Sequence, residues 1–291
     1  MSAHRAIAAI GGGHGLAATL AAVRRLTDDV TAIVSIADDG GSSGRLRDQL
    51  GIAPPGDLRK ALVALADPTA PLTQALVHRF DRGDLAEHAF GNLLIAALTE
   101  VSGDLVDGLD EALRLLGGVG RIVPATRDAV VLRGVTSAGE VVSGQVAVMD
   151  TEALVRVEHE PADPEVPKAA LAALEAADLV LLGPGSLFTS VLAAAATPRL
   201  VAALRSTAAP LVYVCNLRPQ DPETRGMGVR DHVDALHRHG IRPDRVLYDP
   251  ATIDGADGVE GATAVPLARA IGLAHDPELL AAAIEALDLS E

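Results

Sequence analysis

Short apolar runs alternate with longer stretches of helical periodicity over most of the chain. Runs of strand length occur at residues 6–10, 30–37, 178–182 and 211–215, with a shorter one near Val246. Apolar residues at helical spacing predict helices over residues 15–26, 57–66, 71–80, 91–101, 105–116, 168–177, 231–239 and 277–287, and another starting at Leu187. This alternation predicts an α/β fold with a mostly parallel, doubly wound sheet that has helices on both faces.

The pattern changes between Arg121 and His159, where β-branched residues and turn signals replace the helical spacing. Ser137-Ala138-Gly139 and Ser143-Gly144 are suited to closing short hairpins. We therefore expect a small antiparallel β insertion at about residues 121–160, inside one domain that spans residues 1–291.

Composition narrows the range of partners. Hydrophobic residues make up 49% of the 291 residues, which is enough for a large core, whereas aromatic residues make up only 2%. A base-stacking surface is therefore not expected. The formal net charge of −15 repels phosphate backbones and anionic lipid, so neither nucleic acid nor a membrane surface is an expected partner.

No segment is expected to span a membrane or direct export. Residues 179–198 are uncharged and about as long as a membrane span, but their glycines and prolines favour a strand, a turn and a buried helix. The first residues are not expected to act as an export signal, and the single Cys215 permits no internal disulfide. These features are typical of a protein of the reducing cytoplasm.

A glycine-rich loop follows the first predicted strand. Within GGGHGLAA, Gly13-His14-Gly15-Leu16-Ala17-Ala18 fits the G-x-G-x-x-A pattern between a strand and a helix, in which glycines let the backbone approach a phosphate at the helix N-terminus. A tight turn without a ligand is the alternative, but three consecutive glycines exceed what a turn requires. The candidate ligand-binding residues here are Gly11, Gly12, Gly13, His14 and Gly15.

The sequence ADDGGSSGRL lies at the carboxyl end of the second strand, where open α/β sheets bind their ligands. Asp38 stands roughly where such folds place an acid that binds a ribose hydroxyl, and Asp39 could serve the same ligand. The two carboxylates are also candidate ligands for Mg²⁺, unless they only form the turn. Gly40, Ser42 and Ser43 complete this candidate site.

Basic residues gather just after this loop in an otherwise acidic chain. Arg45 and Arg59 carry guanidinium groups suited to phosphate oxygens, although a solvated helix face is the alternative. Asp57 either caps the following helix or contacts the ligand, and the same choice applies to Asn92 in HAFGN.

The second half of the chain repeats the arrangement. In LVLLGPGSLFTS a strand, a Gly-Pro-Gly turn and a helix start predict a second anion-binding loop that faces the first, with Gly183, Gly185 and Ser186 as candidates. The spacing of the G-x-S-x-G nucleophile elbow is absent, so Ser186 is not expected to be a nucleophile. Asn216, after the next strand, has an amide suited to reading a polar ligand.

The sequence DHVDALHRHG offers Asp231 and His232 at the start of a helix and hence on the expected ligand edge. His232, His237 and His239 do not share one helix face as the two histidines of HExxH do, so a metal site is not predicted for them.

In this order, GGGHGL, ADDGGSSGRLR, PPGDLRKALVALA, FGNLLIAALTE, LGPGSLFTS, VYVCNL and DHVDALHRHG resemble the family related to the F420-pathway 2-phospho-lactate transferases. Within it the chain is most similar to the branch called gluconeogenesis factors, or uridine-diphosphate-sugar-binding regulators. The resemblance runs from Ile7 to about Asp276.

This resemblance implies a Rossmann-like three-layer α/β/α fold and a cytoplasmic protein that regulates cell shape and cell-wall precursor supply during gluconeogenic growth. It implies a nucleotide diphosphate sugar such as UDP-N-acetylglucosamine as the ligand, with a homo-oligomer and a regulatory protein partner as further expectations. Two alternatives stay open. One is a Mg²⁺-dependent phospholactyl transferase that acts on a deazaflavin with a guanosine diphosphate-linked donor, and the other is a nicotinamide-dependent oxidoreductase.

Overall fold

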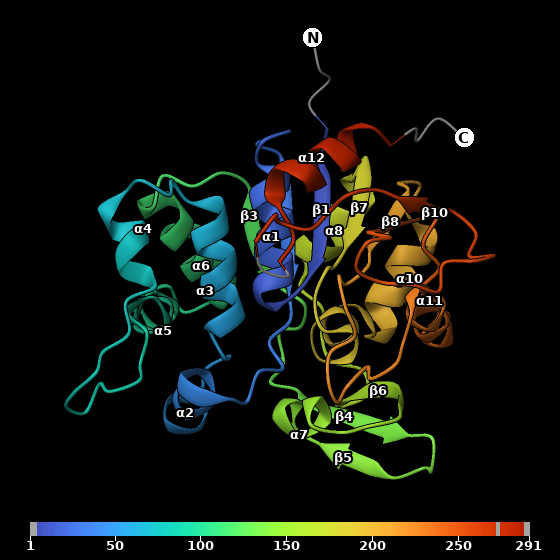
Figure 1. Ribbon diagram of the computed structural model, residues 1–291. Helices are drawn as coiled ribbons and strands as arrows, with labels where there is room; N and C mark the ends of the chain where they lie inside the picture. The colour runs from blue at the N-terminus through green and yellow to red at the C-terminus, as the bar shows by residue number, and fades with distance from the viewer. Residues whose placement is uncertain (1–4, 272–273, 288–291) are drawn as a thin grey trace.

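The computed structural model describes residues 5–271 and 274–287. Within these residues, seven strands form one parallel sheet in the order β10-β9-β8-β7-β1-β2-β3, which runs through the centre of Figure 1. The strands are β1 (Ile7–Gly11), β2 (Val30–Val34), β3 (Arg121–Pro124), β7 (Leu179–Leu182), β8 (Leu211–Val214), β9 (Arg245–Tyr248) and β10 (Ala262–Ala264). The predicted doubly wound parallel sheet is confirmed.

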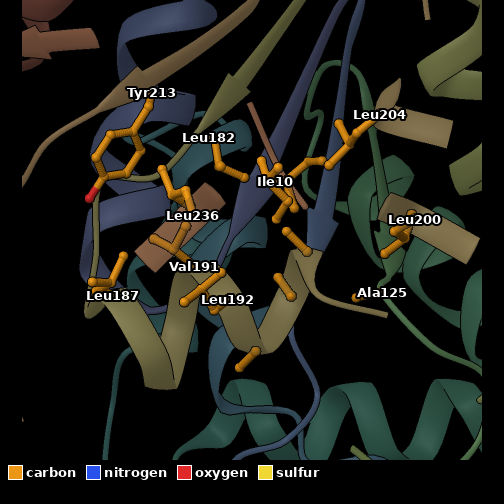
Figure 2. Packing of buried hydrophobic residues seen from close by; sticks show 14 of the residues in the cluster. Ile10, Ala125, Leu182, Leu187, Val191, Leu192, Leu200, Leu204, Tyr213 and Leu236 are labelled. Atoms are coloured by element: carbon orange, nitrogen blue, oxygen red, sulfur yellow. The ribbon is translucent and has the colours of Figure 1, made fainter. Parts of the chain in front are cut away.

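Both faces of the sheet are buried, as alternation along β1 shows. Ile7 and Ala9 pack into the core on one face, whereas Ala8 and Ile10 pack into the core on the other. Figure 2 shows the second core, where Ile10, Leu182 and Tyr213 from three neighbouring strands lie close to side chains of the covering helices.

Helices supply the other half of each core. The core around Ile7 is completed by α1 (Gly13–Val23), α3 (Gly56–Leu65), α4 (Pro71–Leu76), α5 (Phe90–Ser102), α6 (Leu105–Leu115) and α12 (Pro277–Glu285). The core around Ile10 is completed by α8 (Lys168–Ala176), the π-helix η1 (Leu187–Leu192), α9 (Ala193–Ala195), α10 (Pro198–Ser206) and α11 (Val229–Arg238). The chain therefore has the expected three layers.

One helix was not predicted. Residues 41–50 form α2 (Gly41–Leu50), where the sequence indicated a polar loop. Its buried face consists of Ser42, Ser43, Gly44 and Leu46, which are mostly small or polar. Apolar periodicity was therefore missing, because this helix packs through backbone and hydroxyl groups rather than through large apolar side chains.

Other boundaries moved as well. The predicted helix over residues 71–80 ends at Leu76, and the second strand ends at Val34 rather than Ala37. The helix from Leu187 is divided into η1, α9 and α10, and β10 was not predicted. Burial of β7 and η1 confirms the strand, turn and buried helix expected at residues 179–198.

No single helix of the described residues has the length and apolar character that a membrane span requires. The bent pair Leu187–Ala195 and Pro198–Ser206, at 73° to each other, meets that test only as a pair.

The insertion is a separate antiparallel sheet at the bottom of Figure 1. It consists of β4 (Val131–Thr136), β5 (Val141–Ser143) and β6 (Leu154–Glu160) in the order β5-β4-β6. The turn at residues 137–139 joins β4 to β5 as predicted. Two expectations were wrong: residues 121–124 form β3 and extend the main sheet beside β2, and Gly144 precedes the helix α7 (Gln145–Met149) instead of closing a hairpin.

The strand order places the site. From β1 the chain first builds the sheet toward β2 and β3, and later returns to the other side of β1 with β7 and β8. The loops that follow β1 and β7 therefore meet at the carboxyl edge of the sheet, at a topological switch point. This crevice is where doubly wound folds bind their ligands.

Candidate functional site

The loop Gly11–Gly15 joins β1 to α1. Gly12 is the N-cap of α1, and none of the described residues supplies a capping side chain or a first-turn acid. Gly13 has a φ of +66°, a left-handed conformation that favours glycine. Because free N–H groups and the positive end of the helix dipole both face this loop, it is suited to bind an anion.

The loop after β7 packs directly against the first glycine loop. A Cβ on Gly15 would overlap the carbonyl group of Pro184, and a Cβ on Gly185 would lie 3.4 Å from the carbonyl oxygen of Gly12. Glycine is required at Gly15 because the two backbones touch, and it is favoured at Gly185 because the φ of that residue is +145°. The structure thus brings together the two loops that the sequence placed opposite each other.

The first of these loops leaves its helix N-terminus without a capping side chain from the described residues, although the Asp57 carboxylate stands beside it, 2.5 Å from where a Cβ on Gly12 would lie. Glu223 is 2% exposed, and its Oε1 accepts hydrogen bonds from the N–H groups of Phe188 at 2.7 Å and Thr189 at 3.0 Å. Burial raises the pKa of the Glu223 carboxyl, and these donors act in the opposite direction. The prediction of a second anion-binding loop is therefore corrected: an internal carboxylate already occupies that helix end.

A cleft of about 860 Å³ opens beside the two loops, and we call it the central cleft. Its polar lining includes His14, Lys60, Ser186, Asn216, Arg218 and Arg269. Asn216 is one of the lining residues, and its Oδ1 accepts a hydrogen bond from the Gly185 N–H at 2.9 Å. The cleft thus combines an open helix N-terminus with cations and an amide.

Sequence reasoning found part of this lining. His14, Gly15, Gly185, Ser186 and Asn216 were predicted and do line the cleft. Burial, and next the charge of Lys60, lower the pKa of His14, so its imidazole is neutral at pH 7. Arg218, Glu223 and Arg269 were missed, because they lie in long irregular segments and no local pattern marks them.

Asp39 does not face the cleft. Its two carboxylate oxygens accept hydrogen bonds from the N–H groups of Gln145 at 2.9 Å and Val146 at 3.0 Å, and so cap the N-terminus of α7. Asp39 therefore anchors the antiparallel insertion to the main sheet. This capping role was not expected from the sequence, and the assignment of Asp39 as a ligand or Mg²⁺ residue stays a prediction.

The carboxylate near Asp38 is that of Asp57 rather than that of Asp39. The Oδ1 of Asp38 accepts a hydrogen bond from the Gly40 N–H at 3.0 Å, and Ser43 is a further partner. Burial, and to a smaller extent the charge of Asp57, raise the pKa of Asp38, so the two carboxylates are near each other. Asp57 is buried, and its Oδ1 is paired with Lys60 at 2.9 Å.

These groups fit a magnesium ion better than the predicted pair does. Carboxylate and hydroxyl oxygens are the ligands that Mg²⁺ prefers, and Asp38, Asp57 and Ser43 would hold it. A bound ion would offset the repulsion between the two carboxylates. In the part of the chain that the structure describes, no three His, Cys, Asp or Glu side chains come together as a metal site.

Ser42, Arg59 and Asn92 were predicted as ligand residues and are joined in one buried network. The Arg59 Nε donates to Asn92 Oδ1 at 3.0 Å, and Asn92 Nδ2 donates to Ser42 Oγ at 3.0 Å. Ser42 Oγ in turn lies 3.0 Å from Nδ1 of His88. None of the four lines the central cleft, and Arg45 instead donates to the carbonyl oxygen of Ala86 at 3.0 Å.

Asp231 and His232 do not line the cleft either. Asp231 accepts a hydrogen bond from the Gly228 N–H at 2.8 Å and so closes the first turn of its own helix α11. His232 is 0% exposed, and its Nδ1 lies 2.8 Å from the hydroxyl of Tyr213. The ligand-edge prediction failed for this pair because His232 lies on the face of α11 that packs into the core.

Known proteins resemble the chain over most of its length. The family model described as 2-phospho-L-lactate transferase CofD matches residues 7–264. A Mycobacterium tuberculosis protein described as "Putative gluconeogenesis factor" is 47% identical over 255 residues, which cover 84% of this chain and 74% of that protein. A Bacillus subtilis "Gluconeogenesis factor" is 39% identical over 235 residues, which cover 80% of this chain and 74% of the relative.

A solved structure shares the whole fold. The crystal structure of a member of the UPF0052 family from Bacillus halodurans superposes with a TM-score of 0.90 and is 34% identical. The match covers 97% of this chain and 99% of that one.

Proposed function

The chain belongs to the 2-phospho-L-lactate transferase CofD family, and we propose that within it the protein is a gluconeogenesis factor that binds a nucleotide diphosphate sugar, such as UDP-N-acetylglucosamine, in the central cleft. Binding would report the supply of cell-wall precursors to a regulatory protein partner and so influence cell shape during gluconeogenic growth. The relatives named gluconeogenesis factor support this general role.

The observation that carries the ligand assignment is the open N-terminus of α1 beside the cleft. A diphosphate placed there would receive N–H groups from the first turn of α1, and Lys60, Arg218 and Arg269 line the same cleft, together with the acids Asp221 and Glu223. Glu223 fills the other helix end, so the diphosphate has one position rather than two.

The rest of the cleft favours a uridine and a sugar over a flat ring system. None of the residues that line it is a Phe or a Tyr, whereas Asn216, Gln220 and His275 offer polar groups. Flat multi-ring ligands are usually held by aromatic or apolar walls. A volume of about 860 Å³ is also within the range of small-molecule sites.

The phospholactyl transferase remains the second candidate. The description of the family model favours it, and so does the pair of Asp38 and Asp57, which could hold Mg²⁺ beside the phosphates. A transferase would need a deazaflavin to bind next to the diphosphate.

Calorimetric titration separates the two candidates. We expect UDP-N-acetylglucosamine to bind with a dissociation constant in the micromolar range, about −8 kcal/mol. GDP with a deazaflavin and Mg²⁺ should show no phospholactyl transfer. Transfer at about 1 per second or faster would identify an enzyme instead, and a lack of UDP-sugar binding would reject the regulator.

A further inference from the structure

Three helix N-termini converge on the buried network of Ser42, His88, Asn92 and Arg59, which we call the arginine network. Ser42 is the second residue of α2, Arg59 the fourth of α3 and Asn92 the third of α5. No side chain of the described residues caps any of these three helices. In Figure 1, α3 and α5 lie on the same side of the sheet with α2 below them. The first turns of α2 and α5 contain no acidic residue, whereas α3 carries Asp57 in its first turn, so positive dipole ends without an acid are contributed by α2 and α5.

Arg59 adds a buried cation with unused donors. The residue is 9% exposed, and its stem crosses Gly91, where a Cβ would lie 2.8 Å from Arg59 Cγ and Cδ. Only its Nε has a hydrogen-bond partner among the described residues, Asn92. The two terminal nitrogens of Arg59 have no such partner among the described residues and are partly exposed to solvent. Arg59 therefore keeps donors free for an anion, and the carboxylate whose charge acts on it is that of Asp57.

Further positive charge surrounds the same point. Burial is the largest cause that lowers the pKa of Arg59, and the charge of Arg79 is the second. Burial also lowers the pKa of His88, followed by the charges of Arg45 and Arg79. In the described parts of the chain, no carboxylate lies within 4.0 Å of Arg45, Arg59 or Arg79. In contrast, Lys60, the next residue on α3, is paired with Asp57.

A structural role in holding the loop between α4 and α5 explains only some of these basic residues. Arg45 donates to the carbonyl oxygen of Ala86 and Arg79 to that of Glu87, so both hold the loop between α4 and α5. Holding the loop does not require the buried Arg59. It also does not require His88, whose pKa is lowered and whose Nδ1 faces Ser42. In a chain with a net charge of −15, such a concentration of unpaired positive charge points to an anionic ligand.

The arginine network is distinct from the central cleft. Residues 59 and 60 follow each other on α3 and so point about 100° apart. Lys60 lines the cleft, whereas Arg59, Ser42, His88 and Asn92 do not. The two ligand positions thus lie on different sides of α3.

We propose that the arginine network binds the phosphate group of a second, small ligand, either inorganic phosphate or a phosphate monoester. The terminal nitrogens of Arg59, the guanidinium of Arg79 and the N–H of His88 would donate to its oxygens, and the helix N-termini would stabilise its charge. The protein would then respond to a small phosphorylated compound in addition to the ligand of its central cleft.

Titration calorimetry tests this directly on the full chain. Inorganic phosphate and glycerol 3-phosphate are each titrated alone and with saturating UDP-N-acetylglucosamine. We expect phosphate to bind in both conditions, because the sites are separate. If both probes bind, the site accepts esters, and if only inorganic phosphate binds, it takes the free ion. No binding of either probe, or loss of binding when the nucleotide sugar is present, would overturn the proposal.

Two variants assign the binding to the network. Arg79→Gln should weaken phosphate binding about tenfold, whereas Arg82→Gln, an exposed arginine of the same loop beside Asp81, should change it less than twofold. Asn92→Asp gives Arg59 its own carboxylate, so it should abolish phosphate binding without lowering the melting temperature. Phosphate binding that survives Asn92→Asp would contradict the proposal even if the nucleotide sugar binds as expected.

Discussion

Glu223 and Thr189 are joined by two hydrogen bonds, one from the Thr189 N–H to Oε1 at 3.0 Å and one from the Thr189 hydroxyl to Oε2 at 3.1 Å. This contact places a carboxylate at the helix end where a Gly-Pro-Gly turn indicates a phosphate. A ligand in the cleft can therefore contact the N-terminus of α1, whereas Glu223 occupies the N-terminus of η1.

Replacement of Glu223 tests this internal anion. Glu223→Ala leaves the N–H groups of Phe188 and Thr189 without their acceptor, so the free energy of unfolding should fall by about 1–3 kcal/mol. Acetate should restore part of the loss because it supplies the same acceptor atoms. Glu140→Ala, in an exposed turn, is the control, and an equal effect of acetate on both variants would refute the prediction.

Buried His232 predicts loss of stability in acid. Burial lowers its pKa from 6.5 to about 4, so the unfolded chain binds a proton more readily than the folded one between these values. The stability due to neutral His232 is complete above pH 6.5 and is lost as the pH falls toward 4, on the order of 3 kcal/mol.

His232→Asn removes this titrating group and keeps a polar atom near Tyr213, so its unfolding free energy should depend less on pH over that range. His237→Asn, on the exposed side of the same helix, should retain the pH dependence of the original chain. Parallel pH profiles for all three proteins would show that His232 does not contribute.

Asp39 should act on the insertion rather than on a metal ion. Asp39→Ala removes the cap of α7 and should cost about 1 kcal/mol, with faster amide hydrogen exchange in residues 145–149. Any effect of Mg²⁺ on ligand binding should remain, whereas Asp38→Asn should weaken it. Asp48→Ala, an exposed acid on α2, controls for loss of charge. A Mg²⁺ response lost in Asp39→Ala would support the metal-ligand assignment instead.

We expect nucleotide binding to require the absence of a side chain at Gly13, and not only the positive φ of this residue. Gly13→Ala should weaken UDP-N-acetylglucosamine binding at least tenfold, because a methyl group at the start of α1 enters the space of the phosphate. Gly51→Ala is a matched control, since Gly51 has a φ of +68° against +66° for Gly13 and caps the far end of α2. Similar melting temperatures with unequal affinities are the expected result, and equal affinities would argue against the glycine loop as the phosphate site.

The sequence by itself determined the parallel sheet, the position of the two glycine loops and the antiparallel insertion. These features follow from local causes: apolar runs of strand length, helical spacing, and glycines where a strand turns into a helix. His14 and Asn216 were found in the same way, because each lies within three residues of the end of a strand and the carboxyl ends of parallel strands share one edge.

Only the tertiary structure decided which polar groups remain available for a ligand. Asp39 accepts a hydrogen bond from the N–H of Gln145 at the start of α7, 106 residues further along the chain. The acceptor of the Phe188 N–H is Glu223, 35 residues away. His232 has the residue type and position of a ligand, yet the orientation of α11 turns it into the core. Hydrogen bonding depends on distance in space, so a sequence can show which residues are able to bind a phosphate, but the folded chain decides which of them are already paired.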